Sequence, residues 1–370
     1  MTYSRLVEEA LVNTGLDKMR RFGPKIAVIG CGGGGCNSVN RLKSLGLSDV
    51  ETIAINTDRC HLEMISADKK IFIGEHITKG FGTGGNPVLG EKCARDSYDE
   101  IMRAVADLDL AFITAGMGGG SGTGISHVVA EAARRAGALT VAIVTSPFSY
   151  ERGRLEVAQQ GIARLNQIAH CTIVLDNNKL LRLAPRLPID RAFGVMDHLI
   201  ADTMKGLSET LFETSMINID FSDFHSVMSK GGMGTMMLSQ SEDVKELVEE
   251  SLSNPFLDVD LSEAEGALIH ITGGPEMSLK EAYAVFQGIT DRLPSARNIK
   301  FGARIDANEK SRMKKVIGIV TGVKPGSISG ERFGRIVGDI RTPRIGHSLE
   351  LFGPNSFKKP IHPSPPGSRP

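Results

Sequence analysis

Hydrophobic positions follow two different spacings along the chain. From Lys25 onward, short β-rich apolar runs such as "KIAVIG", "LAFITAG" and "TVAIVTSPF" alternate with stretches of helical spacing such as "ISHVVAEAARRAG". Strands this apolar, without strict polar alternation, are typical of a parallel sheet that helices cover on both faces. We therefore predict an α/β fold with a doubly wound, mostly parallel sheet, whose ligands bind at the carboxyl ends of the strands.

A long helical stripe divides the chain into two parts. Residues 189–212 carry apolar side chains at helical spacing, and beyond them the candidate strands "EGALIHITGG" and "KKVIGIVTGV" bracket a further helix. The pattern predicts a first domain over residues 25–188, a long central helix over 189–212, and a smaller α+β domain over 213–323.

The two ends of the chain show different patterns. The helical spacing of apolar positions in residues 1–24 predicts a helical extension that packs against the protein. The alternative is a helix that binds a partner or a membrane. We predict a flexible tail over residues 324–370, because its last part, "FGPNSFKKPIHPSPPGSRP", is rich in proline and lacks acidic residues. The short segments "RFGRIVGDI" and "RIGHSLELF" are either plain linker or partner-binding motifs.

Composition excludes several classes of protein. Lys plus Arg and Asp plus Glu each total 43 in 370 residues, which argues against coating a nucleic acid. The five cysteines form no C-x-x-C pair and accompany no secretory signal, so we expect a cytoplasmic protein. No apolar run approaches the roughly 18 residues of a membrane span. The nine histidines show no metal-binding spacing, and we assign no metal ligands to protein side chains.

The first strand leads directly into a glycine-rich loop, "GCGGGGCNSVN", at residues 30–40. Glycines let backbone N–H groups approach an anion, and the following helix adds the positive end of its dipole. The same loop fits G-x-G-x-x-G, and Asn56 and Asp58 follow at the distance expected for a ribose contact. Taken alone, the loop is compatible with a nucleotide phosphate site or an NAD-type oxidoreductase.

A second glycine-rich loop, "GMGGGSGTG" at residues 116–124, separates these readings. A dinucleotide fold needs one such turn, whereas two loops on one sheet edge suit the longer phosphate chain of a nucleoside triphosphate. Ser121 and Thr123 can donate hydrogen bonds to phosphate oxygens. A merely tight turn would need one or two glycines instead of six. A third segment, "TKGFGTGGNP" at 78–87, is either a phosphate-sensing loop or a surface connection, and no P-loop motif occurs.

Two carboxylates stand three residues apart in "NIDFSDF". Asp220 and Asp223 can share one face at the start of a helix, where they could orient or deprotonate an attacking water. Their alternative role is to cap that helix, as Asp often does.

Six motifs occur in an order that resembles the FtsZ family of cell-division GTPases, in the tubulin superfamily. They are "GCGGGGCN", "AINTD", "TKGFGTGGNP", "GMGGGSGTG", "TSPFSYE" and "NIDFSDF", and the resemblance runs from about Lys25 to Val323. The amino-terminal extension and the tail resemble archaeal members. The resemblance implies a GTP-hydrolysing protein that polymerises head to tail, in a division ring at midcell. It also implies Mg²⁺ on the phosphates of GTP or GDP, and contacts of the tail with membrane-anchor or other division proteins.

The resemblance also implies roles for individual residues. Hydrolysis would be completed in trans by Asp220 and Asp223, with Asn218 in the same loop of the next subunit. The implied GTP-binding residues are Gly33, Gly34, Gly35, Cys36, Asn37, Asn56, Gly120, Ser121, Gly122, Thr123, Gly124, Glu151, Arg154, Phe193 and Asp197.

Three positions depart from the family pattern. Ser121 stands where threonine is usual. Cys36 stands at a position that is usually glycine, and it could be a packed thiol as readily as a neighbour of the nucleotide. The segment after Glu151 is one residue short, so either Arg152 or Arg154 could face the nucleotide. Two other functions stay open: an NAD-type oxidoreductase, and a GTP-binding filament protein with little turnover.

Overall fold

The computed structural model describes residues 23–325, except 47–48, 184–185, 187, 213–214, 230, 254–258, 308 and 310–311. The helix predicted near the amino terminus and nearly all of the predicted tail lie outside the described residues.

Six parallel strands form the first part of a sheet, in the order β3-β2-β1-β4-β5-β6. These strands are β1 (Ile26–Cys31), β2 (Glu51–Asn56), β3 (Lys69–Phe72), β4 (Leu110–Gly116), β5 (Leu139–Ser146) and β6 (Cys171–Asp176). The helices between and after them are α3 (Gly32–Ser44), α4 (Arg59–Met64), α5 (Glu75–Thr78), α6 (Pro87–Asp96), α7 (Tyr98–Val105), α8 (Gly120–Arg135), α9 (Arg152–Ile168) and α10 (Asn178–Leu183).

Helices cover both faces of this parallel part, as the apolar strands predict. Alternate residues of β1 belong to different cores: Val28 packs in a cluster that includes residues of α3 and the central helix, whereas Ala27 and Ile29 pack with residues of α6, α7, α8 and α9. All six residues of β1 are buried. The prediction of a doubly wound parallel sheet is therefore confirmed.

The second part of the chain begins with the central helix and adds antiparallel pairing. Strand β11 runs antiparallel to both β7 and β9, and β10 runs parallel to β9. The elements are α11 (Ile189–Phe212), α12 (Phe221–Met228), β7 (Met233–Ser241), α13 (Val244–Ser253), β8 (Val259–Asp260), β9 (Gly266–Gly273), α14 (Leu279–Thr290), β10 (Asn298–Ile305), β11 (Lys314–Thr321) and β12 (Lys324–Pro325).

Two features of this second part go beyond the sequence prediction. Besides the central helix, β6 and β7 join the two parts directly, because Thr172 and Ile173 pair with Met233 and Gly234 in one ten-stranded sheet. The tail was also expected to begin at residue 324, but β12 pairs with β8, so its two residues belong to the second part.

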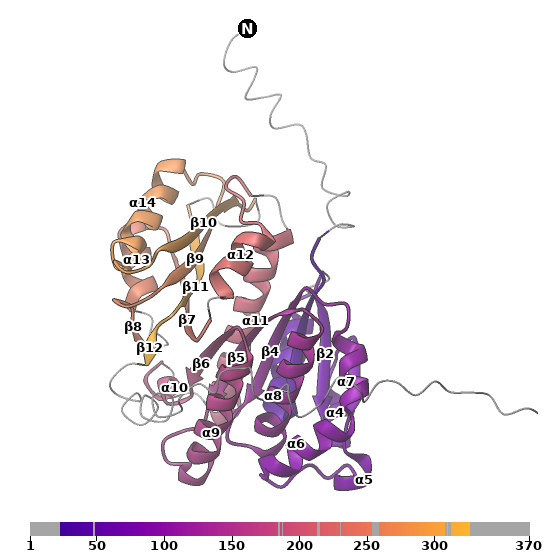
Figure 1. Ribbon diagram of the computed structural model, residues 1–370. Helices are drawn as coiled ribbons and strands as arrows, with labels where there is room; N and C mark the ends of the chain where they lie inside the picture. Colours follow the sequence, from indigo (N-terminus) through magenta and orange to yellow (C-terminus); the bar gives the residue numbers. More distant parts are fainter. Residues whose placement is uncertain are drawn as a thin grey trace, which may run out of the picture.

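The central helix separates two ends of the molecule. Its 24 residues correspond to a length of about 36 Å. Figure 1 shows the carboxyl ends of the parallel strands near α5, α6 and α9 at the bottom of the view, whereas α12 lies toward the top.

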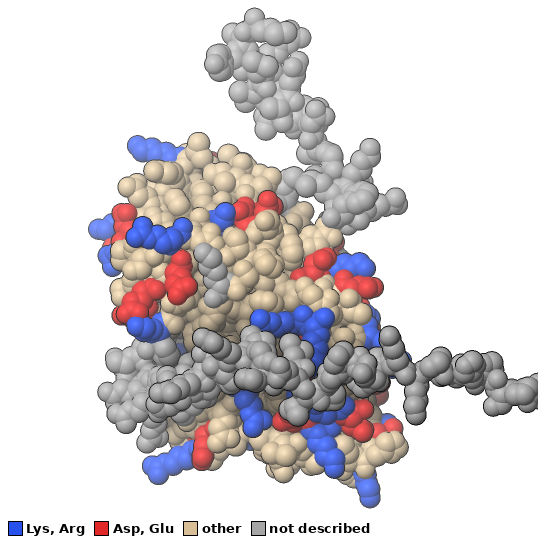
Figure 2. Space-filling model, viewed as in Figure 1, with Lys and Arg blue, Asp and Glu red and all other residues tan. Residues whose placement is uncertain are grey.

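The surface carries charges of both signs: in Figure 2, basic and acidic side chains are interspersed over the described part of the visible face. Within the described residues, no helix is long and apolar enough to span a membrane.

Candidate functional site

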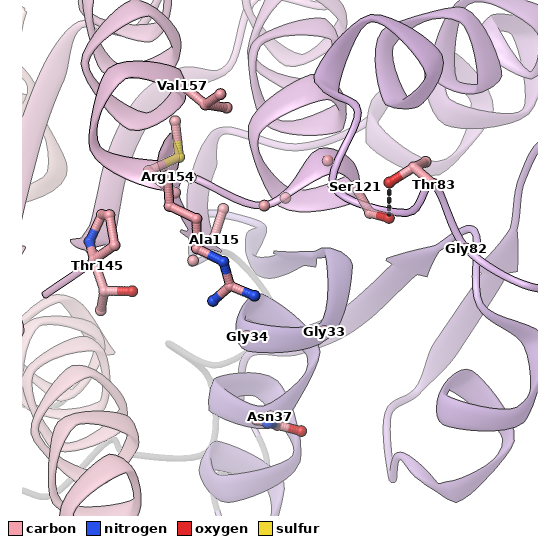
Figure 3. Close-up of a pocket in the computed structure, with 18 of the residues that line it drawn as sticks. Gly33, Gly34, Asn37, Gly82, Thr83, Ala115, Ser121, Thr145, Arg154 and Val157 are labelled. Carbon is pink, nitrogen blue, oxygen red and sulfur yellow. Dashed lines mark hydrogen bonds between the residues drawn. The ribbon is translucent and has the colours of Figure 1, made fainter. Parts of the chain in front are cut away.

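A pocket of about 950 Å³ opens at the carboxyl ends of the parallel strands. The turns after β1, β4 and β5 line it, together with the segment after β3 and the start of α11 (Figure 3). Of the proposed GTP-binding residues, eleven line this pocket: Gly33, Gly34, Asn37, Asn56, Gly120, Ser121, Gly122, Glu151, Arg154, Phe193 and Asp197.

The two glycine-rich loops meet at the floor of the pocket. Gly32 has a φ of +67°, and a Cβ added to it would lie 2.5 Å from the backbone nitrogen of Gly122. A Cβ on Gly34 would lie 3.2 Å from Gly116. A side chain at Gly32 would therefore push the loops apart, which gives the run of glycines a steric reason. The loops converge, as the reading of a triphosphate site requires.

Four of the proposed GTP-binding residues lie behind the pocket and do not line it. Gly35 sits against β4, where an added Cβ would be 2.2 Å from the carbonyl oxygen of Thr114. The Cys36 thiol is fully buried, and burial raises its pKa to about 12. Thr123 Oγ1 accepts a hydrogen bond from Gly118 N (2.9 Å), and Gly124 packs closely against α6. In the structure these residues hold the loops in shape.

Three hydroxyl groups meet at the start of α8. Ser121 Oγ lies 2.7 Å from Thr57 Oγ1 and 3.2 Å from Thr83 Oγ1, the second contact being drawn in Figure 3. Thr83 belongs to the third glycine-rich segment, which is tied to the end of β2 because Gly82 N donates to Thr57 O (3.3 Å). The third segment therefore lines the pocket, as a phosphate-sensing loop would, and its contact with a phosphate stays a prediction. The role of Thr57 and Thr83 was not predicted, because no local pattern reveals contacts this distant in sequence.

The amino-terminal part of α11 closes another side of the pocket. Asp197 accepts a hydrogen bond from Ser38 Oγ on α3 (2.7 Å), and burial raises the pKa of its carboxyl group, although this bond and the charge of Arg41 oppose the shift. Phe193 is partly exposed and makes an edge contact with Phe148 at 5.7 Å between ring centroids. An aromatic face and an oriented carboxylate are groups that can hold a purine base. Ser38 was not singled out from the sequence.

The turn after β5 brings both candidate arginines to the pocket. Arg152 and Arg154 line it, and Arg154 Nη1 lies 2.8 Å from Glu151 Oε2. In Figure 3 the Arg154 side chain extends from α9 toward the turn at Gly33 and Gly34. This guanidinium group can approach a phosphate while its carboxylate partner fixes its direction.

The proposed catalytic residues lie outside this pocket. Asp220 is exposed and caps α12, with its Oδ1 accepting from Asp223 N (2.7 Å). Asp223 forms an ion pair with Lys300 Nζ (2.6 Å), and Asn218 Oδ1 accepts from Ser215 N (2.5 Å). Asp220 therefore caps a helix, as the alternative reading proposed. That helix, α12, lies toward the end of α11 away from the pocket (Figure 1). One chain does not bring its own Asp220 to its own pocket.

Among the described residues, no group of three or more His, Cys, Asp or Glu side chains could hold a metal ion. Mg²⁺ on a nucleotide does not require such a cluster, because it keeps several waters and binds phosphates with few protein oxygens. The hydroxyl oxygens of Ser121 and Thr83 are ligands of the kind that Mg²⁺ prefers, so the site fits a phosphate-bound ion.

Comparisons with known proteins agree with this geometry. Residues 25–185 match the family model described as "Tubulin/FtsZ family, GTPase domain", and residues 230–324 match "FtsZ family, C-terminal domain". Cell division protein FtsZ 2 of Methanocaldococcus jannaschii is 46% identical over 340 residues, which are 90% of this chain and 89% of the relative. Cell division protein FtsZ 2 of Halobacterium salinarum is 44% identical over 310 residues, or 83% and 79% of the two chains.

Solved structures give the same result. An FtsZ dimer from M. jannaschii is similar with a TM-score of 0.76 and 41% identity, covering 87% of this chain and 92% of the other. A protofilament of CetZ2 from Haloferax volcanii shares the fold, with a TM-score of 0.72 and 20% identity over 86% of this chain and 100% of the other.

The fold and pocket define a protein that binds a nucleotide at the carboxyl edge of a parallel sheet. With these comparisons, the chain belongs to the tubulin/FtsZ family. It is a GTPase of the cell-division cytoskeleton that binds GTP and GDP and associates with itself. The matching family models favour this function over that of an NAD-type oxidoreductase. The expected resemblance to archaeal relatives is confirmed.

Proposed function

We propose that each active site forms between two subunits, with the pocket of one chain and the loop of Asp220 and Asp223 from the next. The observation that carries this proposal is the separation of the two groups along α11, whose 24 residues correspond to about 36 Å. A contact between opposite ends of identical chains repeats without closing and makes a filament. Assembly and hydrolysis would then depend on each other.

In the proposed site, the pocket binds GTP by backbone and side-chain groups together. N–H groups of the turns at Gly33–Gly34 and Gly120–Gly122 contact the phosphates, and the amino-terminal ends of α3 and α8 add favourable dipoles. Arg154 contacts a phosphate oxygen. Phe193 packs on the base, and Asp197 accepts hydrogen bonds from the guanine edge. These assignments are supported by the lining of the pocket and the Ser38–Asp197 bond.

In the proposed reaction, a water molecule attacks the γ-phosphorus, the bond from that phosphorus to the β–γ bridging oxygen breaks, and GDP and phosphate leave. The Asp220 carboxylate of the next subunit orients the water and accepts its proton as the new bond forms. Asp223, held by Lys300, keeps a second negative charge beside it. Mg²⁺ bound to the phosphates, near Ser121 and Thr83, would supply neutralisation of the developing charge.

Asp220 provides a direct test, because its capping and catalytic roles can be separated. Asparagine is as good an N-cap as aspartate, so Asp220→Asn should keep α12 stable while losing the carboxylate. We expect GTP turnover to fall about 100-fold or more in both Asp220→Asn and Asp220→Ala, with GTP binding unchanged in Asp220→Asn. Turnover is measured by phosphate release and binding by calorimetry.

The capping reading makes the opposite prediction. If Asp220 only caps α12, Asp220→Asn retains wild-type turnover and only Asp220→Ala is impaired. A wild-type chain that binds GTP and assembles but releases almost no phosphate would instead support the filament protein with little turnover.

We also propose that residues 324–370 contact membrane-anchor or other division proteins and that the protein acts in a ring at midcell. The two short apolar segments in "RFGRIVGDI" and "RIGHSLELF" support this proposal. Removing residues 326–370 should leave GTP turnover intact and abolish the midcell ring seen by fluorescence microscopy. A truncated chain that still forms the ring would contradict it.

A further inference from the structure

A chain of polar groups leads from the end of β2 to the nucleotide pocket. It begins at Asn56, which is 2% exposed. Asn56 Oδ1 accepts hydrogen bonds from the backbone N–H groups of Thr57 (2.9 Å) and Asp58 (3.3 Å). Because both neighbours are donors, the amide oxygen must face them. The amide NH₂ group of Asn56 therefore faces the other way, toward His61 Nδ1 at 3.2 Å.

This arrangement determines which nitrogen of His61 carries the proton. An amide NH₂ group only donates, so Nδ1 must be the acceptor and the proton of the neutral ring lies on Nε2. His61 Nε2 lies 3.0 Å from Asn37 Oδ1 and therefore donates to it. The backbone at His61 is also fixed, because His61 N donates to the Asp58 carboxylate that caps α4 (3.0 Å).

The last group of this chain of polar groups, the Asn37 amide, lines the nucleotide pocket. Asn37 lies on α3, is exposed and lines the pocket, where Figure 3 shows it one turn along the helix from Gly33 and Gly34. Since its oxygen is taken by His61, its NH₂ group is left to donate. Oxygens dominate the sugar and phosphates of a nucleotide, so a donor is the useful group at this position. Without His61, the amide could turn and present its oxygen instead.

We propose that His61 is a positioning residue that fixes the Asn37 amide so that its NH₂ group donates to a sugar or phosphate oxygen of the bound nucleotide. This inference rests on the proposed function in one respect, namely that the nucleotide occupies this pocket. His61 itself touches neither the reacting atoms nor the attacking water.

The first test replaces His61 and measures GDP affinity by calorimetry at protein concentrations below assembly, so that no turnover is involved. His61→Ala should weaken GDP binding about 5- to 10-fold, the effect of one hydrogen bond. His61→Gln should restore affinity to within about 2-fold, because a glutamine amide can accept from Asn56 and donate to Asn37. Steady-state kinetics should show that His61→Ala affects binding alone: its KM for GTP should be raised, whereas its kcat at saturation should be retained.

The second test reverses the group that Asn37 presents. In Asn37→Asp, one carboxylate oxygen still accepts from His61 while the other faces the ligand as an acceptor, so GDP binding should fall about 10-fold or more. Asn40→Asp is the matched control. This variant adds the same charge about one turn further along α3. One oxygen of the new carboxylate can still accept from Ser66 N, as Asn40 Oδ1 does at 2.8 Å. We expect its affinity to stay within about 2-fold of the wild type.

The outcomes separate this inference from the proposed function. If the wild-type chain binds GDP and His61→Ala binds it equally well, the positioning role is overturned and the pocket assignment stands. Equal losses in His61→Ala and His61→Gln would show that the ring acts through packing, which also overturns it. Equal losses in Asn37→Asp and Asn40→Asp would reduce the effect to charge alone and contradict the donor role. If wild-type GDP binding does not respond to Asp197→Ala, the pocket assignment itself fails.

Discussion

The two sites at the ends of α11 present different kinds of group. The pocket is shaped by close contacts between backbones, such as Gly32 against Gly122, and its carboxylates have partners in the same chain: Glu151 with Arg154, and Asp197 with Ser38. The loop at the far end presents Asp220, which is exposed although its Oδ1 accepts from Asp223 N, and Asp223, which pairs with Lys300. The pocket therefore gathers the groups proposed to bind the nucleotide, whereas the carboxylates proposed to activate water lie outside it, toward the other end of α11.

The largest expected effect comes from breaking the backbone contacts of the pocket. Gly35→Ala would place a methyl group 2.2 Å from Thr114 O, so we expect a loss of more than about 2 kcal/mol of stability together with GTP binding. Gly33→Ala is the control, because its added Cβ meets nothing within 4 Å. It should unfold at the wild-type temperature, as measured by calorimetry. Similar melting of the two variants would contradict the steric account of the loops.

A smaller effect is expected from a charge pair in the second part of the molecule. The buried Lys314 Nζ lies 2.9 Å from Glu281 Oε1, and it also donates to the carbonyl oxygens of Glu242 and Arg312. Glu281→Gln should cost about 1–2 kcal/mol of stability, because the ammonium group keeps only neutral acceptors. The GDP affinity of Glu281→Gln at 25 °C should equal that of the wild type if the pocket is independent of this region. A lower affinity would contradict that independence.

The same pair predicts a dependence on pH. Hydrogen bonds from the backbone and side chain of Ser278 and from Lys314 lower the pKa of Glu281 from 4.5 to about 2. A carboxyl group whose pKa is lowered by folding contributes stability above its unfolded pKa. This contribution should be present above pH 4.5 and disappear as the pH falls toward 2. Denaturant unfolding of the wild type and Glu281→Gln should therefore converge over this range, and a constant difference would contradict the assignment.

The smallest expected effect on stability is at Asp197, where it should have the opposite sign. Burial raises the pKa of this carboxyl group, so its ionised form opposes folding once the pH rises through the folded pKa. Without nucleotide, Asp197→Asn should be more stable than the wild type at pH 7 and equal to it at low pH. Its affinity for GTP should fall nevertheless. A variant that is less stable at pH 7 would contradict the stated cause of the shift.

The sequence predicted the parts of the molecule that depend on local pattern. Continuous apolar runs identified the parallel strands, and helical spacing gave the bounds of α11. The glycine-rich loops were recognisable because each follows a buried strand directly. These signals are contained within about 25 residues, where periodicity and turn chemistry act.

Contacts between distant segments were not predictable in the same way. Ser38 meets Asp197 across 159 positions, and Ser121 meets Thr57 across 64. Nothing near either residue indicates its partner, since serine and threonine occur in many loops and helices. The direct pairing of β6 with β7 was missed for the same reason. Cys36 shows the same limit. Its place in a glycine-rich motif suggested a contact with the nucleotide, whereas in the structure it is buried in a cluster with Ala54, Leu62 and Ile65.

The central claim is that two subunits share each active site, and mixing two inactive variants tests it most directly. Asp220→Asn has an intact pocket and lacks the carboxylate, whereas Asp197→Ala has an intact carboxylate and a deficient pocket. Each alone should release almost no phosphate from GTP. An equal mixture should recover about a quarter of wild-type turnover if the variants alternate at random along the filament. A mixture that co-sediments but is no more active than the separate variants would contradict a shared site.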